Sequence, residues 1–531
     1  MREVVGEVVC DAVGEVVGVG GPVLLLVPGQ SVARAVGRGA VVTGTGAATV
    51  ADVVDRLRPT LPDGTAIAVV GTAERLDPRL RPGQLVVASE LWTAGCAGSG
   101  PGVPGVPGSA GRRVLPSAEL LAAELRREGH DVAVGAVATA SHPSDVGVDA
   151  RAALARAGAL VLDHDSAWAA ALADGDRPLA VVRAAEDLPG PGAMAAADTG
   201  RAAASLVAVR PPLERWARAC TDRPRHVVLA AQRSFCAGVE RAIEIVERAI
   251  ERYGPPVYVR RQIVHNTHVV SRLAAMGAVF VDELGEVPDT ATVVLAAHGV
   301  APAVREEAAG RSGFHVIDAT CPLVAKVHHE ARRYASRGFE IVLVGHADHE
   351  EVVGTVGEAP DRMHLVASVD EARRIDLDEP DRVAYLTQTT LATDETGEVI
   401  GALRSRFPGI VGPSADDICY ATQNRQDAVR AIARECDLLL VVGSANSSNT
   451  ARLVEVARRE GCRAELVEDA GQLRLSWLDG ARTVGLTAGA SAPESIVDEV
   501  VQALGRLGPI EIDERRTTDE SVRFALPPQV R

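Results

Sequence analysis

The sequence predicts an α/β protein made of several domains. Short apolar, β-branched runs alternate with helical patterns along the chain, and such alternation is typical of parallel sheets buried on both faces. The 531 residues exceed what one ordinary core accommodates, so two to four domains are expected. Apolar residues make up 47% and charged residues 24%, a composition that excludes wholesale disorder.

The predicted strands are short, mostly apolar runs. In chain order they span residues 66–70, 85–88, 227–230, 293–296, 341–344, 383–386, 438–442 and 483–486. Each runs into a segment rich in Gly, Ala, His, Thr or Ser, and ligands of parallel sheets bind beyond the carboxyl ends of the strands. Three of these segments, GHADHEE, GSANSSN and GASAP, are similar to one another and indicate a repeated α/β unit.

Breaks in composition divide the chain. Residues 96–113 are a Gly/Pro/Ser loop, residues 210–225 contain three prolines and are predicted to be a linker, and periodicity is lost after Leu507. The expected parts are an N-terminal domain over 1–215, a second domain over 225–510 and a C-terminal tail over 511–531.

Charge and hydropathy exclude several classes of protein. The net charge of -16 argues against a bulk nucleic-acid or anionic-membrane binder. No uninterrupted apolar stretch approaches the ~18 residues of a membrane span, and the start, MREVVGEVV, lacks the layout of a secretion signal. We therefore expect a cytoplasmic protein without nucleic-acid or membrane partners.

Three of the eight cysteines occupy one kind of position. Cys236, Cys321 and Cys419 each lie near the start of a predicted helix, where the helix dipole and free N–H groups favour thiolate, the form that iron–sulfur clusters need. Because a cubane cluster normally takes four thiolates, three would leave one iron free for substrate. Ordinary structural thiols are the alternative. The other five are expected to be structural: Cys10, Cys96, Cys220, Cys436 and Cys462.

Histidines and small polar residues at the strand ends predict an anion pocket. Two predicted helix starts carry hydroxyl and amide groups suited to phosphate oxygens, and Ser491 opens a predicted capping box with Glu494. Ordinary helix capping is the alternative for either start alone. Glu351 is the candidate general acid, with Glu350 competing. The candidate anion-binding residues are His265, His298, His346, His349, Ser447, Ser448, Asn449 and Ser491.

Nine motifs cover just over half of the chain. They are FCAGVERA (235–242), IVHN (263–266), AHGV (297–300), DATCPLV (318–324), GHADHEEVVGT (345–355), TQTTL (387–391), DDICYATQNRQ (416–426), GSANSSN (443–449) and TAGASAP (487–493). In order and spacing they closely resemble the 4-hydroxy-3-methylbut-2-enyl diphosphate reductases, the last enzymes of the methylerythritol phosphate isoprenoid pathway.

The resemblance implies three pseudo-repeated α/β units around a central [4Fe–4S] cluster held by Cys236, Cys321 and Cys419. It implies that the anion-binding candidates other than His346 hold the substrate diphosphate, that Thr389 lies near the substrate hydroxyl and that Glu351 delivers protons. The reaction would be a two-electron reductive dehydroxylation to isopentenyl and dimethylallyl diphosphate, with a ferredoxin or flavodoxin as electron donor. Two positions depart from the family: Ser234 stands where Gly is usual, and Glu350 where Pro is common.

The N-terminal third resembles nucleoside phosphorylases more faintly. The matching stretches are VVTGTGAAT (41–49), GTAERLDPRLRPGQLVVASEL (71–91), LDHDSAWAAAL (162–172) and VVRAAEDL (181–188). The resemblance implies Asp165 as the ribose-contacting acid and Asp187, beside an unusual Glu186, as the base-site acid. Glu74 and Arg75 replace small residues. A degenerate structural or ligand-sensing module and an active phosphorylase are both open, and for the whole chain the competing class is a non-catalytic cluster-bearing sensor.

Overall fold

The computed structural model describes residues 22–37, 40–45, 47–94, 109–141, 146–173, 177–187 and 204–531. The sequence features at MREVVGEVV, at Cys10 and in most of the loop 96–113 lie outside these ranges. The chain forms two compact units. Unit 1 comprises residues 1–226, 470–482 and 500–511, and unit 2 comprises residues 227–469, 483–499 and 512–531. No helix within the described ranges is both long and apolar enough to cross a membrane.

The described residues of unit 1 form one mixed sheet of eight strands. They are β1 (Val23–Val27), β2 (Ala40–Val42), β3 (Ala66–Arg75), β4 (Leu85–Ala94), β5 (Ser109–Val114), β6 (Val132–Ala140), β7 (Ala159–Asp163) and β8 (Leu179–Glu186). The strand order is β2-β1-β3-β7-β6-β4-β5, and β8 pairs with both β3 and β4. The β1–β3 and β6–β7 pairs are parallel, whereas β4–β5 is antiparallel.

Helices cover this sheet. They include α2 (Gln30–Val36), α3 (Ala47–Leu57), α4 (Ala118–Arg127), α5 (Val148–Ala157) and α6 (Ser166–Ala169). The apolar residues of α3 recur at helical spacing, so Val50, Val54 and Leu57 share one buried face and pack into the core with Ile67 and Val69 of β3.

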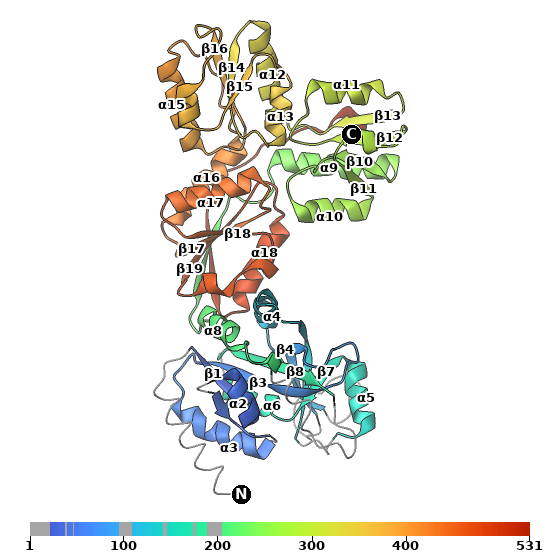
Figure 1. Ribbon diagram of the computed structural model, residues 1–531, viewed down its shortest axis with the longest axis vertical. Coiled ribbons are helices and arrows are strands. Elements are labelled where there is room, and N and C mark those ends of the chain that lie inside the picture. Colours follow the sequence, from blue (N-terminus) through green and yellow to red (C-terminus); the bar gives the residue numbers. More distant parts are fainter. Residues whose placement is uncertain are drawn as a thin grey trace. The chain divides into compact units, whose positions relative to one another are not determined.

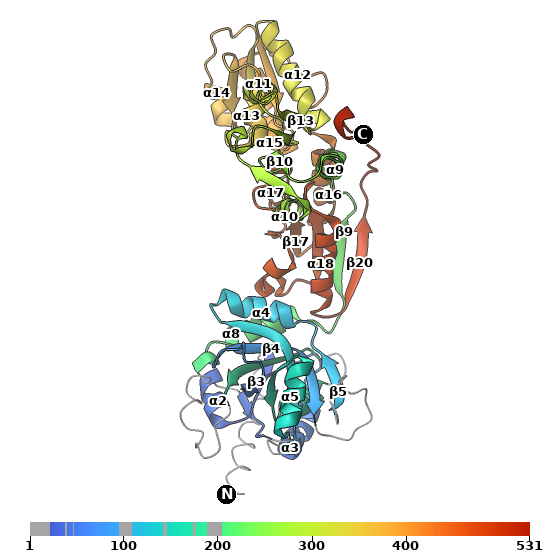
Figure 2. The ribbon, with the colours of Figure 1, turned by 90° about the vertical axis from the view of Figure 1, so that its right-hand side faces the viewer.

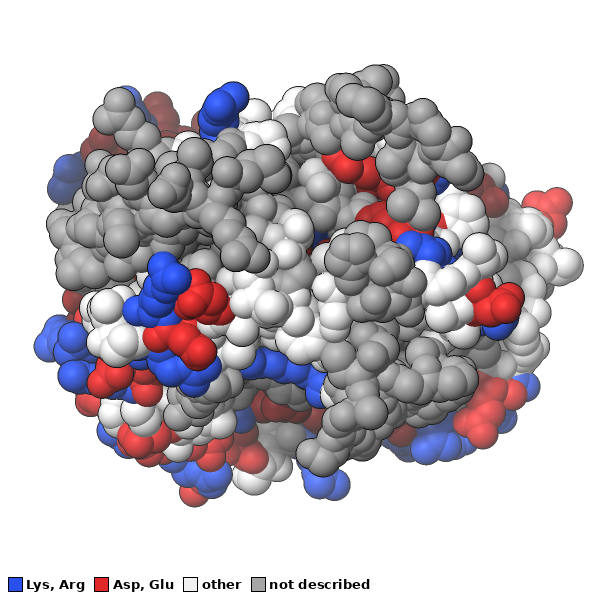
Figure 3. Space-filling view, turned by 90° about the horizontal axis from the view of Figure 1, so that it is seen from below, with Lys and Arg blue, Asp and Glu red and all other residues white. Residues whose placement is uncertain are grey.

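On the face seen in Figure 3, described acidic and basic side chains lie interspersed.

The predicted linker over 210–225 is wrong in its first half, because Arg210–Ala219 form helix α8. Pro211 and Pro212 lie in the first turn of α8, where a backbone N–H has no intrahelical partner and the fixed φ of proline suits a helix. Leu213 and Trp216 are fully buried, and the Trp216 indole donates to Ser117 Oγ at 3.0 Å. The stretch therefore packs as part of unit 1.

Unit 2 contains three separate sheets (Figure 1). The first has the order β11-β10-β12-β13, the second β15-β14-β16 and the third β18-β17-β19-β9-β20. Their bounds are β9 (Arg225–Ala230), β10 (Val257–Arg260), β11 (Ala278–Val281), β12 (Ala291–Leu295), β13 (Phe314–Asp318), β14 (Glu340–Val344), β15 (Met363–Val366), β16 (Val383–Thr387), β17 (Leu438–Val442), β18 (Ala464–Val467), β19 (Thr483–Ala488) and β20 (Ile510–Arg515).

Strand pairs in all three sheets of unit 2 are parallel, as the continuous apolar runs predict. Helices follow the strands: α9 (Ala237–Tyr253), α10 (Thr267–Met276), α11 (Pro302–Gly310), α12 (Pro322–Ser336), α13 (Glu350–Val356), α14 (Val369–Arg374), α15 (Thr393–Arg406), α16 (Tyr420–Ala433), α17 (Ser448–Arg459) and α18 (Glu494–Gly505). The predicted α/β fold class is confirmed, and in unit 2 the carboxyl ends of the strands bring polar loops together.

The residues expected as a C-terminal tail pack along unit 2. Strand β20 lies beside β9 at the edge of the third sheet (Figure 2). Beyond it, the Tyr253 hydroxyl of α9 donates to the carbonyl of Gln529 at 2.7 Å, and Val530 is 2% exposed within the core of the first sheet. This segment therefore connects the third sheet with the first.

Candidate active site

One cavity in unit 2 brings together the twelve site residues that the resemblance implies, whereas the candidate His346 is not among its lining residues. Three thiols, three histidines, three serines, Glu351, Thr389 and Asn449 line about 710 Å³ of empty space, part of it open to solvent. Most of them lie in loops that follow strands of the three sheets or in the first turn of the next helix, whereas Cys419 stands between α15 and α16. Polar residues beyond the carboxyl ends of strands thus line one cavity, as expected for parallel sheets, while the role of each residue stays a prediction.

Each of the three cysteines is the N-cap residue of a helix. Cys236 precedes α9, Cys321 precedes α12 and Cys419 precedes α16. The Cys321 carbonyl accepts the first intrahelical hydrogen bond from Ala325 N at 2.9 Å, and Pro322 fills the first helical position, where its missing N–H is not needed. The helix starts thus hold the three sulfur atoms at one cavity wall.

Burial changes the expected ionisation of these thiols. It raises the pKa of Cys321 to about 12 and that of Cys419 to about 11, and Cys236 adds to both shifts. Hydrogen bonds from the first turn of each helix act in the opposite direction but are outweighed. The first-turn hydrogen bonds favour thiolate, as predicted, but at Cys321 and Cys419 desolvation outweighs them. Thiolates at this wall need a compensating cation, which a metal centre provides.

The space between the thiols suits a metal cluster. A Cβ at Gly238 would lie 2.7 Å from Cys321 Sγ and 3.7 Å from Cys236 Sγ, so the glycine in CAG keeps a hollow open between the two sulfur atoms. Three soft sulfur donors from three helix starts, beside a hollow that a methyl group would fill, fit an iron–sulfur cluster.

Glu351 is buried in the same cavity, beside Thr389. Its side chain is 2% exposed, Oε1 accepts from Thr389 N at 2.7 Å and Oε2 lies 2.9 Å from Thr389 Oγ1. Burial raises the pKa of Glu351 to about 7, against the hydrogen bonds from Thr389 that lower it. A carboxyl group with such a pKa gives up and regains a proton near neutral pH, as a general acid must. The Thr389 carbonyl also accepts from Cys419 N at 3.1 Å, which connects this acid to the thiol wall.

Three histidine rings form a cluster at one end of the cavity. The rings of His265 and His298 are stacked with centroids 4.1 Å apart, and His349 meets them edge-on at 5.7 Å and 5.9 Å. Burial, with a contribution from His298, lowers the pKa of His265 to about 3 and that of His349 to about 4. Nδ1 of His349 accepts from Glu351 N at 3.2 Å, so its ring proton is on Nε2. These two neutral rings offer N–H donors without a charge.

Glu350 lies beside this cluster and differs from Glu351 in its electrostatics. Its carboxylate is 3.4 Å from His298 Nδ1 and 3.6 Å from Arg261 Nη1. Burial opposes its ionisation, but His298, His265 and Arg261 together lower the pKa of Glu350 below its ordinary value. The opposite pKa shifts distinguish the two candidates for the general acid, because Glu351 keeps a proton near neutral pH and Glu350 does not.

The serines and Asn449 surround the start of α17. Ser447 caps this helix by accepting from Thr450 N at 3.4 Å, and Asn449 Oδ1 accepts from Ala490 N at 2.8 Å. The capping box predicted for Ser491 is wrong: α18 begins at Glu494, and Ser491 Oγ instead donates to the carbonyl of His265 at 2.9 Å. Ser491 thus ties the third sheet to the histidine cluster.

Two threonines in the cavity wall were missed by the sequence analysis. Thr390 Oγ1 donates to Ser448 Oγ at 3.1 Å, and Thr422 Oγ1 lies 3.1 Å from Cys419 Sγ while accepting from Asn449 Nδ2 at 3.2 Å. A signal was available for Thr422, because it follows Cys419 by three positions at a helix start and residues at that spacing lie on one face.

Unit 1 has a pocket whose lining includes acidic residues, among them Asp165, Glu186 and Asp187. Fully buried Arg183 lies 2.8 Å from both Asp163 Oδ2 and Asp165 Oδ1. Burial raises the pKa of Asp165 to about 6, although Arg183 lowers it.

The two residues that depart from the phosphorylase pattern, Glu74 and Arg75, form ion pairs with other residues of unit 1. Arg75 donates through Nε and Nη2 to Asp187 Oδ1 at 2.8 Å and 2.5 Å. Glu74 accepts from Arg151 Nε at 2.9 Å. The predicted base-site acid is therefore engaged by a guanidinium of its own chain.

Two solved structures similar to this chain differ in how much of it they cover. The structure of the E-1-hydroxy-2-methyl-but-2-enyl-4-diphosphate reductase from Plasmodium falciparum shares 35% identity, covers 58% of this chain and 97% of that chain, and has a TM-score of 0.56. The 5'-methylthioadenosine/S-adenosyl homocysteine nucleosidase of Campylobacter jejuni shares 16% identity, covers 37% of this chain and 98% of that chain, and has a TM-score of 0.31.

Sequence relatives cover more than half of the chain. The 4-hydroxy-3-methylbut-2-enyl diphosphate reductase of Acidothermus cellulolyticus is 57% identical over 308 residues, which are 58% of this chain and 90% of that protein. The 4-hydroxy-3-methylbut-2-enyl diphosphate reductase 1 of Mycobacterium bovis is 54% identical over 317 residues, 59% of this chain and 94% of that protein. The sequence model of the family described as LytB protein matches residues 227–505. The chain therefore belongs to the LytB protein family.

Proposed function

We propose that unit 2 reduces (E)-4-hydroxy-3-methylbut-2-enyl diphosphate to isopentenyl and dimethylallyl diphosphate, the last step of the methylerythritol phosphate isoprenoid pathway. The observation that carries the proposal is the single cavity that joins three thiols, a buried acid with a pKa of about 7 and a cluster of histidine and hydroxyl groups. The reaction consumes two electrons and two protons: the C–OH bond breaks, a C–H bond forms and water leaves.

The electrons require a redox centre at the thiol wall. Cys236, Cys321 and Cys419 would hold a [4Fe–4S] cluster, which would supply electrons one at a time and present an iron without a protein ligand to the substrate hydroxyl. A ferredoxin or flavodoxin is the class of donor suited to such a centre.

The diphosphate is held at the other end of the cavity. His265 and His349 carry N–H groups in neutral rings, and the start of α17 offers backbone N–H groups together with the side chains of Ser447 and Ser448. These donors bind anionic oxygens without a lysine or arginine. His298, Asn449 and Ser491 complete the pocket.

Protons reach the reacting end through Glu351. Its contact with Thr389 Oγ1 at 2.9 Å places a hydroxyl next to the acid, so that Thr389 relays or orients the proton at the substrate hydroxyl. Loss of water from carbon needs this proton, since hydroxide is a poor leaving group.

Turnover over a range of pH tests the proposal. Protein reconstituted anaerobically is expected to convert the diphosphate with dithionite and a mediator, and kcat/KM should fall about tenfold per pH unit above about pH 7. The sign follows from Glu351: its pKa is raised to about 7, so the protonated form is lost as pH rises. His265 and His349, with pKa values of about 3 and 4, do not titrate there. Cluster-loaded protein that leaves the substrate unchanged would contradict the proposal.

We infer that unit 1 is a degenerate module without phosphorylase activity. A base-site acid must give its proton to the leaving base, but Asp187 is held by Arg75. We expect that nucleosides mixed with phosphate and the full chain release no base above the background rate, measured by chromatography. Release of any base at a useful rate would show that Arg75 moves aside and that the chain is bifunctional.

A further inference from the structure

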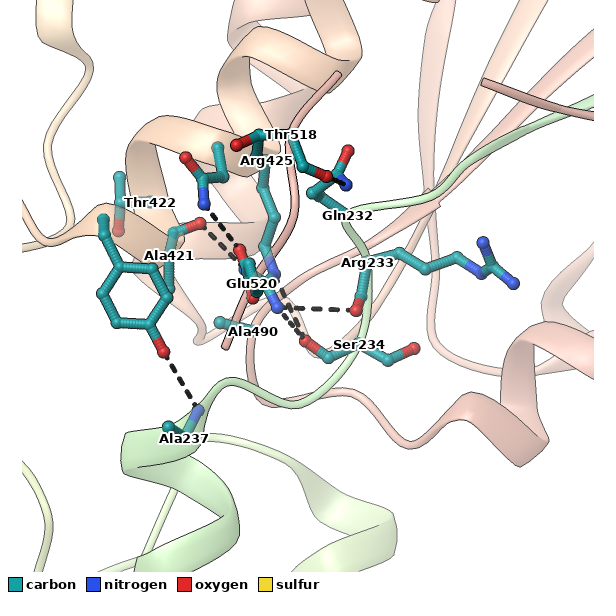
Figure 4. A network of polar contacts seen from close by, with 12 residues as sticks. Gln232, Arg233, Ser234, Ala237, Ala421, Thr422, Arg425, Ala490, Thr518 and Glu520 are labelled. Atoms are coloured by element: carbon teal, nitrogen blue, oxygen red, sulfur yellow. Dashed lines mark hydrogen bonds and ion pairs between the residues drawn. The ribbon is translucent and has the colours of Figure 1, made fainter. Parts of the chain in front are cut away.

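A buried arginine connects two of the three cysteine-bearing elements of unit 2. Arg425 lies on α16, the helix that Cys419 caps, and its side chain is 1% exposed. Its guanidinium donates to the carbonyl of Ser234 from Nη2 at 2.7 Å and from Nε at 3.2 Å, as Figure 4 shows. Weaker contacts at 3.4 Å reach the carbonyls of Arg233 and Phe235. One side chain thus holds the three residues that directly precede Cys236.

The loop held in this way has an unusual backbone conformation. Ser234 has φ of 60°, in the left-handed region that favours glycine. Its Oγ donates to Glu494 Oε2 at 2.5 Å, and the Tyr420 hydroxyl accepts from Ala237 N at 3.3 Å just beyond Cys236. The serine is accommodated, but the loop needs external contacts to keep this path.

The charge on Arg425 is balanced from the C-terminal segment. Glu520 Oε1 lies 3.1 Å from Arg425 Nη1 and also accepts from Asn424 Nδ2 at 2.9 Å. The same segment is anchored to the cysteine loop, because Gln232 Oε1 accepts from Thr517 Oγ1 at 2.9 Å. A buried guanidinium without a counter-ion is costly, so Glu520 stabilises the arginine in place.

We propose that Arg425, with Glu520 as its counter-ion, is a positioning residue that fixes the Cys236 loop against the start of α16. Arginine suits this task because its planar fork donates in several fixed directions at once. The spacing of the Cys236 and Cys419 sulfur atoms depends on this contact. The inference rests on the proposed function, since it concerns thiols that would hold the cluster.

The test measures cluster retention rather than turnover. Reconstituted full-length protein is mixed anaerobically with a ferrous-iron chelator, and the rate of iron release is followed. We expect Arg425→Gln to release iron at least about tenfold faster than wild type, as is usual when a group that orients metal ligands is lost. Arg425→Lys and Glu520→Gln should fall between the two, because each keeps part of the contact. The variant Arg225→Gln is the matched control.

Arg225 is 3% exposed and donates to the carbonyls of Ala219 and Ala481, away from the cysteines of the cavity. Its loss should lower the melting temperature while iron release stays at the wild-type rate. Equal acceleration in Arg225→Gln, or wild-type release in Glu520→Gln and Arg425→Lys, overturns the inference. If Arg425→Gln does not fold, the two milder variants decide. Wild-type protein that takes up no iron overturns the proposed function as well.

Discussion

Replacing Glu351 with Gln should lower turnover about 10²- to 10⁴-fold while leaving the metal centre in place. The amide has the shape of the carboxyl group, and its oxygen can still accept from Thr389 N. It carries no proton that can be transferred. The measurement is anaerobic turnover together with iron content and the absorbance of the cluster in the same preparation.

Glu350→Gln is the matched control for this change. The carboxyl group of Glu350 is adjacent in sequence, but its pKa is lowered by His298, His265 and Arg261 against burial, so it holds no proton near neutral pH. We expect its loss to lower turnover far less than the loss of Glu351, because Glu350 contacts His298 and Arg261 rather than Thr389. If Glu350→Gln is the inactive variant and Glu351→Gln turns over normally, the assignment of the acid is reversed.

The same pair of variants separates an enzyme from a sensor. A non-catalytic cluster-bearing sensor would keep its cluster in Glu351→Gln and would have no turnover to lose in the wild-type protein. An enzyme would keep the cluster and lose turnover. The burial of Glu351 against Thr389, with a pKa of about 7, favours the enzyme, because a sensor needs no acid poised near neutral pH.

Local patterns allowed much of unit 2 to be predicted from the sequence. The apolar runs 341–344 and 438–442 are buried strands, and their polar ends reach the cavity. Cys236 and Cys321 each directly precede a helix whose apolar residues recur at helical spacing. This periodic pattern begins within a few residues of each cysteine. Features of this kind depend on short segments, which a sequence displays directly.

What the sequence did not predict depends on contacts between distant residues. The raised pKa of Cys321 follows from burial by other sheets, which no local pattern reports. Strand β20 pairs with β9 from the far end of the chain, and Glu520 meets Arg425 across the same fold. The pair of Arg75 and Asp187 joins positions 112 residues apart. In each case the partner is chosen by tertiary packing rather than by spacing.

Changing any one of Cys236, Cys321 and Cys419 to serine should remove most of the iron and abolish turnover. Reconstituted wild-type protein should hold about four irons per chain, the content of one cubane cluster. A serine hydroxyl is a poor replacement for thiolate, and two remaining thiolates do not hold the cluster against loss. The measurement is iron and sulfide content per chain after anaerobic reconstitution.

Cys436→Ala and Cys462→Ala are the controls, because both thiols lie within or against the apolar core of the third sheet. Cys462 Sγ donates weakly to the backbone carbonyl of Cys436 at 3.4 Å, so Cys462→Ala should cost about 1 kcal/mol of stability, and neither change should alter the iron content. A full complement of iron in any of the three serine variants would exclude that cysteine as a ligand. Loss of iron in Cys436→Ala would place the cluster elsewhere in the chain.

Because Cys321 and Cys419 have pKa values of about 12 and 11 without a metal, uptake of iron should also release protons, which a pH-indicator dye in weak buffer detects. Each serine variant should release correspondingly fewer.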